Sequence, residues 1–405
     1  MDHSTAAPVA ADGALPLADV TVVALEQAVA APLATRHLAD LGADVIKIER
    51  VGEGDFARDY DDTVHGLASH FVWLNRGKES VSVDLKSPEG VELVLRLIDE
   101  ADVVVQNLAP GAAERLGLGT DVLTARNPRL IVVGLTGYGT TGPRRDAKAY
   151  DMLVQAETGL VSITGTAEQA SKTGIPTSDI AGGMYIVTSV LAALYRRERT
   201  GVGAVIDVSM FDSTVEWLGH PMYVQMYAQR QLPRMGLSHA AIAPYDAYPT
   251  SDGEVLIGVQ NDRGWDALAR EVLADDVLAD DARFTTNVRR VEHRAAVDAA
   301  VAQRTRRLST AELEERLARA GVAAAQVNDM AGLVAHPQLH ARDRWREVQT
   351  EKGPIRAVLP PMNFRDVELS MGAIPALGEH TDSVLERLGL DEEERARLRA
   401  AGIIQ

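Results

Sequence analysis

Cysteine is absent from this chain of 405 residues, which excludes disulfide bridges, thiolate nucleophiles and cysteine-ligated metal ions. Aromatic residues make up only 4% of the chain, and it lacks an uninterrupted apolar run long enough to span a bilayer. Basic residues are outnumbered, and the formal charge of −17 argues against nucleic acid or an anionic membrane as a partner. We therefore expect a globular protein of the cytoplasm.

Common metal and nucleotide motifs are also lacking. The ten histidines are scattered, and no H-E-x-x-H run occurs. The G-x-G-x-x-G match at residues 137–142 is followed by Pro143 and charged residues instead of an apolar helix. A dinucleotide fingerprint needs that helix, and it belongs in the first strand–helix turn, which here contains no glycine. The sequence therefore predicts no metal ion and no permanently bound cofactor.

What the chain does contain is an alternation of strand and helix patterns in its first half. Amphipathic helices are predicted from Pro32 to Gly42 and over residues 87–101. Apolar strands are predicted at residues 20–26, 44–49, 80–85, 102–107, 130–135 and 204–210. Repeated β–α–β units with short turns predict an α/β fold with a doubly wound parallel sheet.

The pattern changes after about residue 231. A turn-linked strand pair is followed by polar helices at residues 262–273, 290–304 and 309–320, which predict a smaller α+β domain. The final segment carries a charged helix at residues 382–400. The predicted organisation is a disordered tail (1–17), a large domain (18–225), a small domain (232–330) and a return segment that completes the large domain (331–405).

The stretch from Gly174 to Tyr185 is predicted to be a loop that enters a helix at Asp179. A carboxylate at a helix start is held ionised by the helix dipole and by free N–H groups. Gly182 and Gly183 follow, and each glycine costs about 1 kcal/mol relative to alanine inside a helix. The pair therefore predicts a close approach to the backbone beyond Asp179. Asp179 is a candidate nucleophile, and an ordinary N-cap is the alternative.

Basic residues gather near the predicted strand ends, and their concentration in the first third of an acidic chain suits an anion with several phosphates. Solvated surface charge is the alternative. They are Lys47, Arg50, Arg76, Lys78, Arg115, Arg144, Arg145 and Lys148.

A series of motifs then resembles the family III CoA-transferases, which include formyl-CoA transferase and carnitine CoA-transferase. The resemblance covers nearly all of the chain after the tail, in order, and the alpha-methylacyl-CoA racemases share the fold and most of these motifs. The matching segments are residues 25–43, 45–50, 75–78, 106–111, 137–143, 200–203 and 378–381.

This resemblance implies a Rossmann-like large domain, an interlaced homodimer, and coenzyme A as substrate and covalent intermediate. Asp179 matches the family's nucleophile, which attacks an acyl-CoA thioester and then carries CoA as an aspartyl thioester. An acceptor carboxylate takes the CoA in the reverse sequence. The residues that would surround CoA by the same matching are Ala28 and Val29 at the turn facing Asp179, Arg50 and Arg76, Asn107, Leu108 and Arg115, and Lys148 and Tyr150.

The substrate predicted from the resemblance is a small dicarboxylic acid such as succinate, malate, mesaconate or citramalate. His65, His70 and His239 are candidates for holding its second carboxylate, with an ordinary surface or core role as the alternative. Formyl-CoA transferase carries glutamine where this chain has Val29, which argues against formyl or oxalate specificity.

Two other functions stay open. Racemases of this superfamily use a His-Asp run and an asparagine four residues before the catalytic aspartate, and here these positions read Tyr150-Asp151 and Ile175. Tyrosine and isoleucine cannot replace a proton relay at an α-carbon, so transferase is favoured over racemase. A non-catalytic CoA-binding protein is the second alternative.

Overall fold

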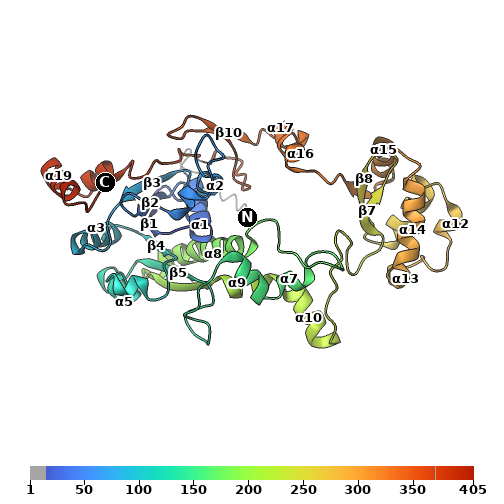
Figure 1. Cartoon of the computed structure of the whole chain (residues 1–405), viewed down its shortest axis with the longest axis horizontal. Helices are drawn as coiled ribbons and strands as arrows, with labels where there is room; N and C mark the ends of the chain where they lie inside the picture. Colours follow the sequence, from blue (N-terminus) through green and yellow to red (C-terminus); the bar gives the residue numbers. More distant parts are fainter. Residues whose placement is uncertain (1–14, 370) are drawn as a thin grey trace, which may run out of the picture. The chain divides into compact units, whose positions relative to one another are not determined.

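The computed structural model describes residues 15–369 and 371–405, and these form two compact units (Figure 1). The first unit contains the described residues up to Thr158, together with Thr173–Gly219 and Asp343–Gln405. The second contains Gly159–Lys172 and His220–Arg342. The first unit is thus assembled from three separate stretches of the chain.

These boundaries differ from the predicted ones. Residues 220–225, predicted as part of the large domain, and residues 331–342, predicted as part of its return segment, belong to the second unit. The loop 159–172 belongs to the second unit, because the N–H of Gly236 donates to the carbonyl oxygen of Gly165 at 2.8 Å. Residues 15–17, predicted as the end of a disordered tail, pack on the first unit. The N–H of Leu17 donates to the carbonyl oxygen of Leu41 at 3.0 Å, and the Leu17 side chain is buried. The rest of that predicted tail lies outside the described residues.

In the first unit, the described residues include a sheet of six strands in the order β3-β2-β1-β4-β5-β6, all parallel. The order reverses between β1 and β4, where the carboxyl ends of neighbouring strands open a crevice suited to a ligand. The strands are β1 (Thr21–Leu25), β2 (Asp44–Glu49), β3 (Lys78–Ser82), β4 (Val103–Gln106), β5 (Ile131–Thr136) and β6 (Ala204–Ser209).

Side chains alternate along the strands between two apolar cores. Val22 and Val103 face the core that contains α1 (Ala30–Asp40) and α8 (Thr177–Thr200). Val23 and Val104 face the opposite core, with α3 (Pro88–Asp99) and α5 (Thr120–Arg126). Because the central strands are covered on both faces, their sequences are continuous apolar runs. The predicted α/β class with a doubly wound parallel sheet is confirmed.

By length and composition, α8 alone among the described helices could cross a membrane. In this structure it packs instead against α1, α9 (Met210–Trp217), β5 and β6. Glycine, serine and threonine interrupt its apolar run, which is why the sequence offered no candidate span.

The remaining helices of the first unit are short. They are η1 (Phe56–Asp59), α2 (Ser69–Leu74), α4 (Ala112–Arg115) and α6 (Asp151–Glu157). The C-terminal stretch adds an antiparallel hairpin of β10 (Trp345–Val348) and β11 (Ile355–Val358), then α18 (Thr381–Arg387) and α19 (Glu392–Ala400). The single helix predicted over 382–400 is wrong, because the chain breaks at Gly389, whose φ is 87°.

The second unit is an α+β structure, as predicted. Its antiparallel strands are β7 (Tyr245–Pro249), β8 (Glu254–Gly258) and β9 (Ala323–Ala325). Trp265 and Phe284 meet edge to face in its core, with ring centroids 5.8 Å apart. Its helices are α7 (Leu160–Ile163), α10 (Gly219–Ala228, whose first residue belongs to the first unit), α11 (Asp262–Ala267), η2 (Leu268–Val272), α12 (Asp276–Ala279), α13 (Asn287–Glu292), α14 (Arg294–Thr305), α15 (Thr310–Ala320), α16 (Met330–Val334) and α17 (Pro337–Ala341).

Candidate active site

Asp179 lies in the first turn of α8, two residues after the helix begins at Thr177. It is not the N-cap that the sequence predicted, because Pro176 occupies that position and offers no side-chain cap. The cap comes from another helix. Asp151, the first residue of α6, accepts hydrogen bonds through Oδ1 from the N–H groups of Ser178 (2.8 Å) and Asp179 (3.3 Å).

The electrostatics of Asp179 also differ from the prediction of a carboxylate held ionised. Burial, and after it the negative charge of Asp151, raises the pKa of Asp179 to about 7. The side chain is partly exposed, and its carboxylate accepts no hydrogen bond from any described residue. Asp179 is therefore a carboxylate without hydrogen-bond donors that titrates near neutral pH.

Tyrosines gather around this carboxylate. Burial, Asp55, Asp179 and Tyr150 all raise the pKa of the Tyr60 phenol, which places these groups in one neighbourhood. Tyr60 and Tyr150 are 48% and 67% exposed, so both rings are accessible to a ligand approaching Asp179. Tyr60 also meets His70 edge to face, with 5.5 Å between the ring centroids. His70, a predicted substrate residue, thus reaches this neighbourhood through Tyr60.

The turn between β1 and α1 lies at the same end of α8. Ala28 and Val29 belong to a small apolar cluster with Leu33, Leu74 and Ile180, the residue after Asp179. The predicted position of Ala28 and Val29 beside the nucleophile is therefore consistent with their packing. Ala28 adopts a φ of 63°, in the left-handed region that disfavours residues with a Cβ.

Two side chains fix this turn. Asp55 accepts a hydrogen bond from the N–H of Ala28 at 3.1 Å. Asn107 contacts both backbone groups of Gln27, accepting from its N–H at 2.9 Å and donating to its carbonyl at 2.8 Å. Asn107 was predicted to contact CoA, and in this structure its amide is already used to hold the turn.

A buried charge network supports Asp55 from below. Lys47 donates to Asp55 at 2.9 Å and lies 3.4 Å from Glu26, while Lys78 donates to Glu26 at 2.6 Å. All four side chains are almost completely buried. Burial alone would raise the pKa of Glu26, but Lys78 and Lys47 outweigh it and hold that pKa below its usual value. Lys47 and Lys78 therefore do not face a phosphate ligand, contrary to the prediction for the basic group.

Arg50 and Leu108 line a small cavity of about 50 Å³ at the carboxyl ends of β1 and β2. The Arg50 guanidinium is exposed and donates to Gln27 Oε1 at 3.1 Å and to Glu53 at 3.2 Å. A guanidinium with only exposed partners remains available to a phosphate. This position fits the predicted contact between Arg50 and the nucleotide end of CoA.

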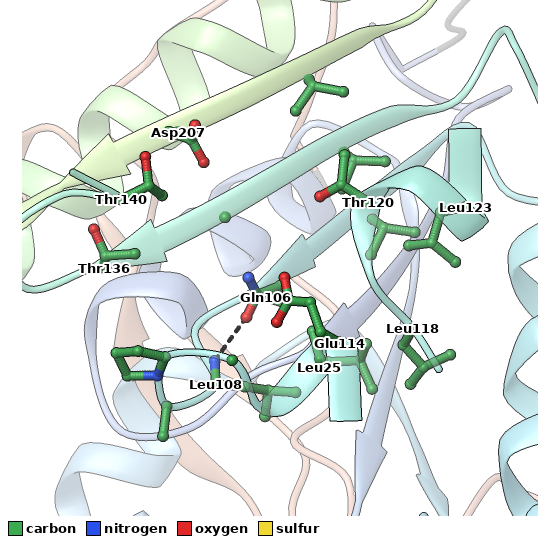
Figure 2. A pocket seen from close by; sticks show the side chains of 18 of the residues that line it. Leu25, Gln106, Leu108, Glu114, Leu118, Thr120, Leu123, Thr136, Thr140 and Asp207 are labelled. Carbon is green, nitrogen blue, oxygen red and sulfur yellow. Dashed lines mark hydrogen bonds between the residues drawn. The ribbon is translucent and has the colours of Figure 1, made fainter. Parts of the chain in front are cut away.

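Leu108 also borders a larger cavity of about 310 Å³, shown in Figure 2. Its N–H donates to Gln106 Oε1 at 2.8 Å, and Glu114 lies on the same side of the cavity (Figure 2). Asp146 and Asp207 line it as well, against the single cation Arg145. This excess of carboxylates disfavours phosphate groups inside the larger cavity.

Three of the predicted residues remain near these cavities or on the loops beside the site. Arg115 follows the lining residue Glu114 and contacts the carbonyl oxygen of Pro110 at 3.5 Å. Lys148 is exposed just before Tyr150, and it has no ion pair or hydrogen bond with any described residue. Tyr150 immediately precedes α6, next to the capping residue Asp151.

Two other predicted residues of the first unit, Arg76 and His65, form no hydrogen bond or ion pair with Asp179. The Arg76 guanidinium is buried and donates twice to Asp40, at 2.7 and 2.8 Å, so it does not support a contact with CoA. His65 is exposed in a turn with a φ of 54°. His239 belongs to the second unit, where its ring stacks on Tyr245 with 5.3 Å between centroids.

A metal site is not supported either. The described residues contain no group of three or more histidine, aspartate or glutamate side chains that could hold a metal ion. His336 and His340 do stand four residues apart at α17, but His336 Nδ1 already accepts the N–H of Gln338 at 3.1 Å.

A profile described as CoA-transferase family III matches residues 17–381. The chain belongs to this family. The protein is therefore a transferase enzyme, and its fold agrees with that assignment. A Brucella suis protein described as CaiB/BaiF family, solved by crystallography, is similar with a TM-score of 0.82 and 36% identity. The match covers 92% of this chain and 99% of that one.

Curated relatives named as CoA-transferases match over most of their length. An "acyl-CoA transferase" of Fusarium pseudograminearum is 36% identical over 402 residues, covering 96% of this chain and 88% of the relative. A "succinate–glutarate CoA-transferase" of Agrobacterium fabrum is 35% identical over 383 residues, covering 92% and 96%. The predicted family is therefore confirmed.

The structure brings two residues near Asp179 that the sequence did not mark as its neighbours, Asp151 and Tyr60. The sequence analysis considered Asp151 only as the aspartate of the racemase His-Asp run, in which this chain has Tyr150 instead of histidine. Its contact with the start of α8 joins residues 27 positions apart, which no local pattern reveals. Tyr60 follows η1 in a loop whose path the sequence does not predict.

Proposed function

We propose that this family III enzyme transfers CoA between an acyl-CoA thioester and a small dicarboxylic acid through a thioester on Asp179. The surroundings of Asp179 give the first support for this proposal. Asp179 is a partly exposed carboxylate without donors, with a pKa near 7, so a substantial fraction is ionised and reactive at neutral pH. The relative named for succinate and glutarate supports the dicarboxylate class.

The chemistry needs no metal ion, ATP or water. An Asp179 oxygen attacks the thioester carbonyl, the carbon–sulfur bond breaks, and CoA leaves as its thiolate, giving a mixed anhydride. The thiolate then attacks the Asp179 carboxyl carbon of the anhydride. The acyl carboxylate departs with the bridging oxygen, and CoA remains on Asp179 as a thioester.

The second half repeats these steps with the acceptor. Its carboxylate attacks the aspartyl thioester, the thiolate leaves, and a new anhydride forms. The thiolate attacks the acceptor's carbonyl carbon, which releases the acceptor as its CoA ester and restores the Asp179 carboxylate. Each developing oxyanion needs a donor, and the exposed hydroxyl groups of Tyr60 and Tyr150 are in the neighbourhood of Asp179.

The surroundings of CoA are proposed from the same geometry. Arg50 would meet the nucleotide phosphates at the carboxyl edge of the sheet, and Lys148 with Tyr150 would lie along the chain towards the thioester. Ala28 and Val29 would form the wall opposite Asp179. No residue has to move a proton at an α-carbon for this reaction, in contrast to the racemase alternative.

We also propose that the enzyme is a homodimer of the cytoplasm. Met184, Leu191 and Tyr195 are exposed on α8 at spacings of seven and four residues, which places them on one helix face. An exposed apolar stripe on a central helix is suited to burial against a second copy. Sedimentation equilibrium should give twice the chain mass, and a monomer at micromolar concentration would contradict the proposal.

The test of the function is a transfer assay with succinyl-CoA as donor and glutarate, mesaconate, citramalate, malate or oxalate as acceptor. We expect a new CoA ester from at least one dicarboxylate of four or five carbons, and no product with Asp179→Ala. The racemase alternative predicts instead that solvent deuterium enters a 2-methylacyl-CoA without any CoA transfer. If the protein binds CoA but gives neither a new CoA ester nor a deuterated acyl-CoA, the result would favour a non-catalytic CoA-binding protein.

A further inference from the structure

The start of α8 is capped by a carboxylate, and the same helix start carries the proposed nucleophile. Asp151 Oδ1 accepts the N–H groups of Ser178 and Asp179, and Ile180 N–H already donates to the carbonyl oxygen of Pro176 at 2.9 Å. The N–H groups of residues 178 to 180 in the first turn of α8 are therefore all occupied. At most helix N-termini such N–H groups are free, and they can stabilise a nearby carboxylate.

Asp151 is itself held firmly. Its Oδ2 accepts a hydrogen bond from Gln155 Nε2 at 2.6 Å, and Gln155 Oε1 accepts the N–H of Thr173 at 3.0 Å. Gln155 is completely buried. The chain of contacts joins α6, the loop before α8 and the first turn of α8, so it fixes where the helix begins.

We propose that Asp151 is a positioning residue: it takes the N–H groups of the α8 N-terminus for itself, and its negative charge beside that helix start leaves the Asp179 carboxylate uncompensated and nucleophilic. This inference rests on the proposed role of Asp179. A carboxylate deprived of donors is a stronger base and a stronger nucleophile than one bound to a helix N-terminus. The second negative charge acts in the same direction.

The other groups that face Asp179 do not offset this effect. Tyr150 and Tyr60 bring phenol groups and no cation, and the raised pKa of Tyr60 keeps that phenol neutral at neutral pH. The turn before α1 presents Ala28 and Val29, and α9 presents Thr214, whose hydroxyl donates to Ser178 Oγ at 2.9 Å. The raised pKa of Asp179, caused by burial first and Asp151 second, agrees with this arrangement.

The hydrogen bonds allow the charge of Asp151 to be separated from its capping role. Asp151→Asn retains an oxygen for the two N–H groups but removes the charge. Its NH2 group then faces the NH2 group of Gln155, and because both are donors the hydrogen bond between the two side chains is lost. Adding Gln155→Glu supplies acceptors for the NH2 group at position 151 and for Thr173 N–H. The pair of substitutions therefore keeps every hydrogen bond and moves the negative charge away from Asp179. Glu157→Gln removes an exposed charge from the same helix and is the matched control.

The experiment measures the titration of Asp179 directly, by NMR of enzyme carrying aspartate labelled with carbon-13 at the side-chain carboxyl. The Asp179 signal is assigned as the one missing from Asp179→Asn. We expect its midpoint to fall by about one pH unit or more in Asp151→Asn and in the double variant, with no change in Glu157→Gln. An unchanged midpoint in folded double variant would overturn the inference.

A second readout follows the chemistry. With a pKa near 7, the rate of CoA adduct formation should be about tenfold lower at pH 6 than at pH 8, and this ratio should shrink in the charge-removed variants. If Asp179→Ala still formed the adduct, the proposed function would fail. The titration would still decide whether Asp151 controls Asp179.

Discussion

Gly183 lies so close to the carbonyl oxygen of Ala30 that a Cβ at position 183 would stand 2.6 Å from it. This contact sets the separation of α8 and α1, the two helices whose starts frame the candidate site. The close approach that the glycine pair predicted is therefore real, but the approaching group is the backbone of α1 and not a substrate. A Cβ at the neighbouring Gly182 would instead stand 3.2 Å from Leu135 Cδ1, at the end of a flexible side chain.

The two glycines should consequently respond differently to alanine. Gly183→Ala has to push α1 away, and we expect it to destabilise the protein by about 1–3 kcal/mol and to lower transfer activity. Gly182→Ala meets only a side chain that can yield, and the gain in helix propensity offsets the crowding, so we expect a change within about 1 kcal/mol. Urea unfolding of both variants measures this, and equal effects would contradict the packing described.

Ala28 occupies a left-handed conformation that glycine adopts without strain. Ala28→Gly should therefore stabilise the folded chain by about 1 kcal/mol, even though glycine makes the unfolded chain more flexible. Ala28→Val should destabilise it, because a β-branched residue is disfavoured at this φ. Thermal unfolding of the two variants gives the comparison, and the reverse order would show that the turn relaxes on substitution.

The buried network of Glu26 and Lys78 should behave as a coupled pair. Lys78→Met leaves Glu26 buried without its nearest cation, and we expect a loss of about 3–5 kcal/mol. Glu26→Gln together with Lys78→Met removes both charges, and it should recover a large part of that loss. A double-mutant cycle by chemical denaturation measures the coupling energy. Additive effects would mean that the two groups do not depend on one another.

At pH values above the ordinary pKa of an aspartate, Asp179 should lower the stability of the folded protein. Its folded-state pKa is raised, so the folded state prefers the protonated form, and stability from this group falls as pH rises from about 4 to about 7. Asp179→Asn should therefore stabilise the protein by about 1–2 kcal/mol at pH 8, after allowance for partial exposure, with little effect at pH 4. Melting temperatures at the two pH values test this, and a destabilised variant at pH 8 would contradict it.

Local pattern was sufficient for the sheet and for the location of Asp179, because buried parallel strands and a long capped helix leave signals within a few residues of sequence. Contacts between distant elements left no such signal. Arg76, Lys47 and Lys78 resembled an anion site because their partners Asp40, Asp55 and Glu26 come from other elements. The cap on α8 was assigned to Asp179 for the same reason, since Asp151 reaches it from α6.

The central claim is that the Asp179 carboxyl carries CoA during transfer, and peptide mapping tests it most directly. Enzyme incubated with succinyl-CoA is quenched in acid and digested, and the peptides are sequenced by tandem mass spectrometry. We expect a CoA adduct on Asp179 that hydroxylamine converts to a hydroxamate at the same residue, and no adduct in Asp179→Ala. An adduct on a different residue, or full transfer by Asp179→Ala, would contradict the claim.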